Sequence, residues 1–255
     1  MKARGLRRVN KRVKRLVAWI LDCYDDSDTI LVFTGDIVDN GSEAEYECAR
    51  AILEPLAERY KLLFAPGNHD VGRMGNAFAS SLQNNFQRHV VGELMQVPGA
   101  MTATNRMAEL YPYVTTTKDC VLIGLDSAHD EEHLASGSVG ARQRRRLDAL
   151  IEGATAPVVV YVHHHPFVRR PWLAMNDAKK LMDLVRGRVH ALLFGHKHRY
   201  RTWHNRDGIC RVNAAPKTSK PRRGTKTGYC LSELNIDGAG LVTFRNREFF
   251  LGRRE

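Results

Sequence analysis

Four short apolar runs in this chain each stop at a turn or a breaker, and polar residues follow at once. The runs and their endings are Thr29–Phe33 before Thr34-Gly35-Asp36, Leu62–Ala65 before Gly67-Asn68-His69-Asp70, Val158–Val162 before His163-His164-His165-Pro166, and Ala191–Phe194 before Gly195-His196-Lys197-His198. Runs of this kind are typical of buried strands. Because sites in open α/β sheets form at the carboxyl ends of strands, we expect the four endings at one edge. The carboxylate, amide and imidazole groups gathered there form a donor set for a divalent cation.

The order of these motifs resembles that of the calcineurin-like metallophosphoesterases. The matching segments are a Gly-Asp pair, Gly-Asn-His-Asp, a histidine two residues before a proline, and Gly-His-x-His. Each motif is weak by itself, but four in the right order, each after a predicted strand, make a strong signal. The resemblance runs from about residue 29 to the end of the chain. Within the family, the chain is most similar to the cyclic-nucleotide phosphodiesterase branch.

The resemblance implies a set of metal ligands. Asp36 matches the carboxylate that bridges two cations about 3.5–4 Å apart, and Mn, Fe, Zn and Mg are the metals expected there. Asn68, His164 and His196 match the residues that join it on one cation. His198 matches a ligand of the other cation, together with the two residues of an Asp-x-His motif. A plain turn aspartate or asparagine is the alternative for a lone residue, but the four motifs together favour ligands.

The resemblance also implies catalytic roles for two further residues. His69 matches a histidine near the substrate that can stabilise the transition state or protonate the leaving alkoxide. Asp70 would orient the His69 imidazole. The implied reaction is attack of a metal-activated hydroxide on phosphorus, in a phosphomonoester or phosphodiester, without a covalent intermediate.

The neighbouring histidines are expected to differ in role. Strand periodicity places His163 and His165 on the opposite side from His164, either as groups that support the ligands or, as we favour, as polar residues at a strand end. His196 and His198 would share a side if the backbone there is extended.

One motif of the family is absent, because no Asp-x-His occurs before Asp36. In one interpretation the sequence begins after the first strand of the domain. In the other, the chain binds one cation well or has become a binding or regulatory protein on the same scaffold. We favour the first, because the chain opens in what resembles the helix after the family's first strand. The second cation, left with Asp36 and His198, would be held weakly.

The pattern predicts one α/β domain over residues 1–255, with a basic helix and turn at 1–28 and the motif-bearing part at 29–255. The alternating middle and the all-β end suit two sheets face to face, and the resemblance implies a four-layer α/β/β/α sandwich, here without its first strand. Helices are predicted at 42–59, 77–91, 138–151 and 176–186. Strands are predicted at 113–117, 120–125, 200–203, 210–213, 228–236 and 241–250, the first two as an antiparallel pair.

The charge balance favours anionic partners. The net charge is +11, and residues 1–15 hold eight lysines and arginines. Apolar residues at helical spacing in 6–21 predict a basic amphipathic helix, which could lie on a membrane or on nucleic acid. We favour a surface helix that packs its apolar stripe on the sheet. A nuclease or lipid-phosphate hydrolase, or a non-enzymatic protein that binds nucleic acid or anionic membrane through residues 2–15 and 217–226, is the alternative function.

Compartment is predicted from what the sequence lacks. It has five cysteines without Cys-x-x-Cys spacing, no apolar run near the roughly 18 residues of a membrane span, and no signal-peptide pattern. These features predict a cytoplasmic protein with reduced thiols.

Overall fold

The structure is a computed structural model of the 255-residue chain, and it describes residues 2–24, 28–71, 84–99, 107–128, 135–215, 229–236 and 242–249. The helices are α1 (Lys2–Cys23), α2 (Glu43–Ala57), the π-helix η1 (Phe86–Leu94), α4 (Met107–Leu110), α5 (Gly140–Glu152), the 3-10 turn η2 (Pro171–Leu173) and α6 (Ala178–Val185). The strands are β1 (Ile30–Phe33), β2 (Lys61–Phe64), β3 (Tyr113–Thr116), β4 (Val121–Gly124), β5 (Val158–Val162), β6 (Ala191–Phe194), β7 (Arg201–Arg206), β8 (Ile209–Ala214), β9 (Tyr229–Ile236) and β10 (Val242–Phe249).

The largest sheet has six strands in the order β3-β4-β5-β6-β8-β7. Its four inner strands run parallel, whereas β3 and β7 pair antiparallel at the two edges. Helix α5 connects β4 to β5 and α6 connects β5 to β6, which is the crossover that parallel strands require. The parallel arrangement brings the carboxyl ends of β5 and β6 to the same edge of the sheet.

Both faces of this sheet are buried at its inner strand β5, which shows how the two faces divide. Val158, Val160 and Val162 pack in one apolar cluster with residues of α5 and α6. Val159 and Tyr161 pack in another cluster, which contains residues of α1, α2 and β2. Side chains alternate between the two faces along a strand. Because both faces are covered here, every residue of β5 is buried.

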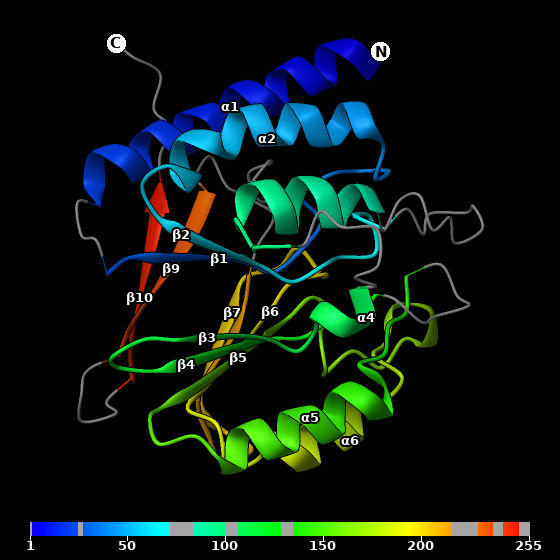
Figure 1. The fold of residues 1–255 in the computed structure, drawn as a ribbon, viewed down its shortest axis with the longest axis vertical. Helices are drawn as coiled ribbons and strands as arrows, with labels where there is room; N and C mark the ends of the chain where they lie inside the picture. Colours follow the sequence, from blue (N-terminus) through cyan, green and yellow to red (C-terminus); the bar gives the residue numbers. More distant parts are fainter. Residues whose placement is uncertain are drawn as a thin grey trace.

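The second cluster joins the six-stranded sheet to another layer of strands. In that layer β1 pairs parallel with β2, and β9 pairs antiparallel with β10. Figure 1 shows α1 and α2 above these strands, the six-stranded sheet below them, and α5 and α6 on its far side. The expected mixed α/β fold is therefore confirmed. Among the described residues the second strand layer consists of two separate pairs, so a four-layer sandwich with two continuous sheets stays a prediction.

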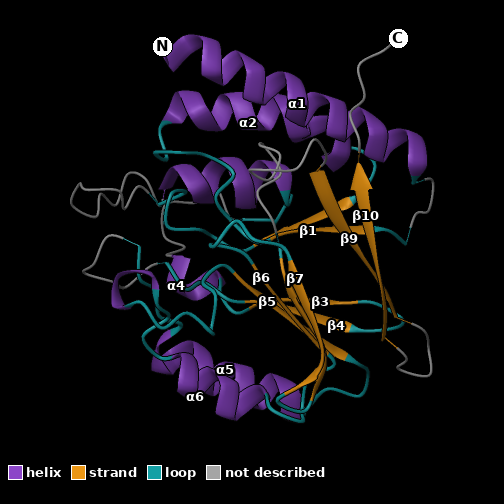
Figure 2. Cartoon of the chain, turned by 180° about the vertical axis from the view of Figure 1, so that it is seen from behind, coloured by secondary structure: helices purple, strands orange, loops and turns teal. Residues whose placement is uncertain are grey.

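Helix α1 docks on α2, and the two lie side by side in both views (Figures 1 and 2). Leu16, Val17 and Ile20 are buried on this face. Arg59 Nη1 donates to the carbonyl oxygen of Leu21 at 2.7 Å, which satisfies one of the carbonyls at the end of α1. The predicted apolar stripe thus packs mainly on a neighbouring helix. Leu16, Val17 and Ile20 are therefore buried within the fold and are not available to contact a bilayer.

The remaining helix and strand predictions agree with the structure to within a few residues, where they can be compared. The predicted helix at 77–91 is described only from residue 84, and its described part continues as η1 to Leu94. The basic loop at 217–226 lies outside the described residues. At the start of α2, Ser42 makes no side-chain cap, and Glu45 accepts a hydrogen bond from the backbone N–H of Asn40 at 2.8 Å.

Two further findings concern membrane-spanning helices and the cysteine thiols. Within the described residues, no helix combines the length and the apolar character that crossing a membrane would need. Cys23, Cys48, Cys120 and Cys210 are free. The cytoplasmic location stays a prediction.

The docking of α1 can be tested by truncating Ile20, which is 5% exposed. We expect Ile20→Ala to lower the free energy of unfolding by about 2–5 kcal/mol, the usual cost of such a cavity. Lys14→Ala, at an exposed position of the same helix, is the matched control and should stay within about 0.5 kcal/mol of wild type. Urea unfolding of the three proteins measures this. Equal stability of all three would mean that α1 is not docked in solution.

Candidate metal centre

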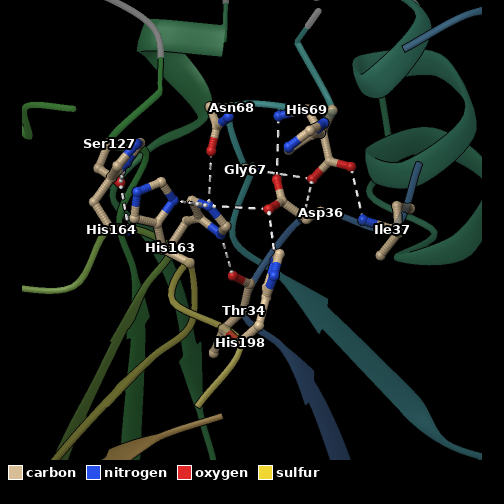
Figure 3. A network of polar contacts seen from close by, with 12 residues as sticks. Thr34, Asp36, Ile37, Gly67, Asn68, His69, Ser127, His163, His164 and His198 are labelled. Carbon is tan, nitrogen blue, oxygen red and sulfur yellow. Dashed lines mark hydrogen bonds and ion pairs between the residues drawn. The ribbon is translucent and has the colours of Figure 1, made fainter. Parts of the chain in front are cut away.

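The polar residues that follow β1, β2, β5 and β6 meet between the two strand layers (Figure 3). Ligand atoms of His163, His164 and His196 all lie within 4.8 Å of one another. Asp36 Oδ2 lies 3.4 Å from His163 Nε2, and Asn68 Oδ1 lies 3.1 Å from the same nitrogen. The expectation that the four strand endings gather at one place is therefore met by the geometry.

The loop after β1 turns sharply to present Asp36. Gly35 and Asp36 both have positive φ, at 90° and 60°, a conformation that glycine adopts easily and aspartate rarely. Gly35 also lies so close to the β5 loop that a Cβ there would meet His163 Nδ1 at 2.6 Å. The glycine is needed both for the turn and for the close approach of the two layers.

The Asp70 carboxylate holds this turn in place. Its Oδ2 accepts the backbone N–H groups of Asp36 and Gly67, each at 2.8 Å. Its Oδ1 accepts those of Ile37 at 2.8 Å and Val38 at 3.2 Å. One fully buried carboxylate therefore ties the loop after β1 to the loop after β2.

The predicted contact between Asp70 and the His69 ring is wrong. His69 Nδ1 instead donates to the carbonyl oxygen of Asp39 at 2.8 Å, with Asp39 Oδ1 3.6 Å away. The reason is that the Asp70 carboxylate points inward, to backbone N–H groups, whereas the His69 ring lies at the rim with 22% of its side chain exposed. Asp39 is therefore the residue that positions the His69 ring, and sequence reasoning missed it.

His163 lies inside the cluster, contrary to the prediction that it is a polar residue at a strand end. The side chains of Val159 and Tyr161 face the layer of β1 and β2, and His163 continues that row. Because Asp36 and Asn68 come from that layer, the histidine on this row is the one that reaches them. Strand periodicity separates the two rows correctly, but only the position of the second layer shows which row faces the site.

His164 reaches the same cluster from a tight pocket. Ser127 Oγ lies 2.8 Å from His164 Nδ1 and also accepts the backbone N–H of His164 at 3.2 Å. Gly137 packs against Nδ1 and Cε1 of the same ring, where any Cβ would collide with it. His164 is fully buried, and its ring centroid lies 4.6 Å from that of His196.

His196 and His198 both face the cluster, although the backbone is not extended as expected. Both have positive φ, at 69° and 53°, so the chain curls rather than continuing the strand. His196 Nδ1 lies 3.1 Å from His163 Nε2. His198 is more exposed, and its Nε2 lies 3.9 Å from Asp36 Oδ2.

His165 takes no part in the cluster. Its ring packs on Phe167, Phe194 and Trp203, with centroid separations of 5.8, 4.5 and 6.1 Å. Burial, followed by Lys197, lowers the pKa of His165 to about 4. The expectation that His165 is not a ligand agrees with this placement.

The charge states in the cluster suit a cation. Burial alone would raise the pKa of Asp36, but His163, His198 and His69 hold it well below its usual value. Burial, followed by His163, lowers the pKa of His196 to about 3. At neutral pH the carboxylate is ionised and the His196 imidazole is neutral, and metal ligands need these protonation states.

An unpaired buried atom provides an independent test of fit. Among the described residues, His196 Nε2 is buried and has no hydrogen-bond partner, which is costly for a polar atom. Imidazole, carboxylate and amide donors are also the ligand types that Zn, Mn and Fe accept. The residues present therefore fit a divalent cation.

Comparisons with known proteins agree with this chemistry. Residues 7–200 match the family described as calcineurin-like phosphoesterase. A probable cyclic nucleotide phosphodiesterase of Ruthia magnifica subsp. Calyptogena magnifica is 24% identical over 193 residues, which are 73% of this chain and 68% of that protein. Another, of Rhodococcus erythropolis, is 29% identical over 179 residues, which are 66% of this chain and 50% of that protein. The matched region thus spans from half to about two thirds of these relatives.

Among solved structures, a dimetal phosphatase from Danio rerio has the same fold. The TM-score is 0.52 at 15% sequence identity, and the alignment covers 81% of this chain and 77% of that one.

The role of Asp70 as a structural anchor can be tested with Asp70→Asn. Burial and the Asp36 carboxylate raise the pKa of Asp70 to about 7, whereas the backbone N–H groups favour the ionised form. If Asp70 is ionised, the amide presents an NH₂ group to N–H donors, and we expect a loss of about 3 kcal/mol or more in unfolding free energy. Asp148→Asn, at an exposed position, is the control. A cost near zero for Asp70→Asn would mean that Asp70 is protonated in the folded protein.

Proposed function

The chain belongs to the calcineurin-like phosphoesterase family, and from this premise we propose that it hydrolyses phosphate esters at a divalent metal centre held by Asp36, Asn68, His164 and His196. The single observation that carries the proposal is the convergence of three imidazoles on one buried point, beside an ionised carboxylate. His198, close to Asp36 at the exposed side, is the proposed ligand of a second cation.

Asp36 and His69 have different proposed roles at this centre. A cation held by these residues would supply an activated water and would neutralise charge on the phosphoryl oxygens. Asp36 remains ionised and fixed by its turn, and its Oδ1 accepts the backbone N–H of His69 at 3.1 Å. The same contact fixes the loop that presents the His69 ring at the rim.

We propose His69 as the general acid of the reaction. Its Nδ1–H is held by the Asp39 carbonyl, so Nε2 is the atom available to a substrate. A proton on Nε2 can pass to the leaving alkoxide, which makes that oxygen a better leaving group. Asp39 Oδ1 lies 3.6 Å from the same Nδ1 atom.

The bond type proposed is a phosphodiester, and the cyclic nucleotides are the substrate class to test first. Support comes from the two relatives described above, which are named as probable cyclic nucleotide phosphodiesterases. The metal identity, among Mn, Fe, Zn and Mg, and a cytoplasmic location are parts of the same proposal. Binding of nucleic acid or an anionic membrane stays a prediction from the net charge.

Metal removal tests the proposed centre. We expect a chelator to abolish hydrolysis of bis-(p-nitrophenyl) phosphate and Mn²⁺ or Zn²⁺ to restore it. His164→Ala and Asn68→Ala should both lower the metal content of the purified protein, whereas His204→Ala, at an exposed histidine, should not. Equal metal content in all four proteins would contradict the proposed ligand set.

The proposed acid is tested separately. His69→Ala should lower kcat by about 10²–10⁴-fold, the usual scale for a lost acid–base group, with metal content unchanged. Steady-state kinetics with a diester and metal analysis of the same sample measure both. Loss of metal with turnover retained would assign His69 as a ligand instead.

A further inference from the structure

Helix α1 has two faces of opposite character. Its apolar face, which includes Val17 and Ile20, is buried where the helix docks on α2. Lys11, Lys14 and Arg15 are exposed, and their spacing of three and four residues places them together on one face. The helix therefore presents cations to solvent once its apolar side chains are packed.

The basic pattern extends beyond these three residues in the sequence. Arg4, Arg7 and Arg8 continue the same helical spacing toward the start of α1. From residue 4 to residue 15 the helix rises by roughly 16 Å. The only carboxylate in the sequence of α1 is that of Asp22, in its last turn. The sequence of α1 thus contains a run of positive charge that it does not itself neutralise.

The exposed cations of α1 are not neutralised by neighbouring elements either. Lys11, Lys14 and Arg15 form no ion pair with a carboxylate in the described part of the chain, although Glu47 is exposed on the adjacent helix α2. Like charges three and four residues apart on a helix repel one another. The arrangement therefore lowers the stability of the helix, and a bound polyanion would relieve the repulsion.

A hollow of about 430 Å³ lies on the same face. Its described lining consists of Asn10, Lys11, Lys14, Arg15 and Ala18. A concave surface lined by charges of one sign concentrates the electrostatic potential. An anion is therefore attracted more strongly here than to lysines scattered over a convex surface.

The position of α1 makes this face accessible to a large partner. Figures 1 and 2 show α1 as the outermost helix on its side of the molecule, with α2 beneath it and α5 and α6 on the opposite side. An α-helix with its side chains is about 10–12 Å across, and the major groove of B-DNA is about 12 Å wide. A helix at the outer surface can therefore approach the phosphates that border this groove.

Two observations favour DNA over a membrane as the anionic partner. Amphipathic helices bind membranes by burying an apolar face, but the apolar face of α1 is packed on α2. The Trp19 ring is also occupied, because it packs edge-on against Tyr24 with the ring centroids 5.7 Å apart. In addition, the basic run is rich in arginine, whose planar guanidinium matches two phosphate oxygens at once.

We propose that the exposed basic face of α1 binds double-stranded DNA through its phosphate backbone, with Lys11, Lys14 and Arg15 among the contacts. Contacts to phosphates carry no sequence information, so the binding is independent of base sequence. The amide of Asn10, on the same face, already donates to Cys48 Sγ at 3.0 Å. The binding requires no metal ion and is separate from the proposed hydrolytic centre.

The test measures the fluorescence anisotropy of a labelled DNA duplex of mixed sequence, titrated with protein in the presence of a chelator. The chelator removes the cation, so capture of the DNA at the metal centre does not contribute. The test variant is Lys11→Ala/Lys14→Ala/Arg15→Ala. The matched control removes three exposed cations from α5 and α6, on the opposite side of the molecule, and is Arg142→Ala/Arg145→Ala/Lys180→Ala.

We expect wild type and the control variant to bind the duplex alike at about 50 mM salt. The α1 variant should bind at least about tenfold more weakly, and its plot of log K against log salt concentration should be shallower by about 2–3, because each phosphate contact contributes about 0.9 to the slope. Lys14→Ala alone should make the slope shallower by about 1. An unlabelled duplex of unrelated sequence should compete as well as the labelled sequence does.

Equal weakening by the two triple variants would overturn the proposal, because net charge rather than α1 would then govern binding. It would also be overturned if wild type failed to bind the duplex, or bound vesicles of equal parts phosphatidylserine and phosphatidylcholine but not DNA. Thermal unfolding checks that each variant is folded, and the salt slope of Lys14→Ala decides if the triple variant is not. Diester hydrolysis by the metal-loaded α1 variant should equal that of wild type, so the proposed function is tested independently.

Discussion

The Asp70 carboxylate accepts hydrogen bonds from four backbone N–H groups that belong to two different loops. Tyr46 adds a further constraint, because its hydroxyl donates to the carbonyl oxygen of Asp70 at 2.7 Å from within α2. These bonds set the separation between the loop that presents Asp36 and the loop that presents Asn68. The metal centre therefore depends on a buried carboxyl group that is not among the proposed ligands.

The elements of the fold and the place of the site can be predicted from the sequence, because they follow from short-range patterns. An apolar run that ends at glycine marks both a strand and its carboxyl end, and parallel strands bring such ends together. For that reason the sequence alone is enough to place Asp36 and Asn68 near the histidines. The boundaries of α5 and α6 also follow from local periodicity, and they differ from the prediction by about two residues.

Features that depend on two layers cannot be predicted in this way. Period two separates His163 from His164, but only the position of the β1–β2 pair shows that His163 faces Asp36. Asp70 is adjacent to His69 in sequence and so resembles a partner for it, yet its side chain turns to four backbone groups. The packing of α1 on α2 rather than on the sheet is equally a matter of which neighbour is available. In each case the missing information is a contact between residues far apart in the chain.

Glycines 35, 67 and 137 have a consequence for how this centre can change over generations. At each of them a single methyl group would collide with a proposed ligand or with His163, although the glycine itself binds nothing. A one-base mutation at any of the three can therefore displace the metal-binding side chains while every ligand residue is still encoded. The heritable information for the site resides as much in positions that have no side chain as in those that hold the cation.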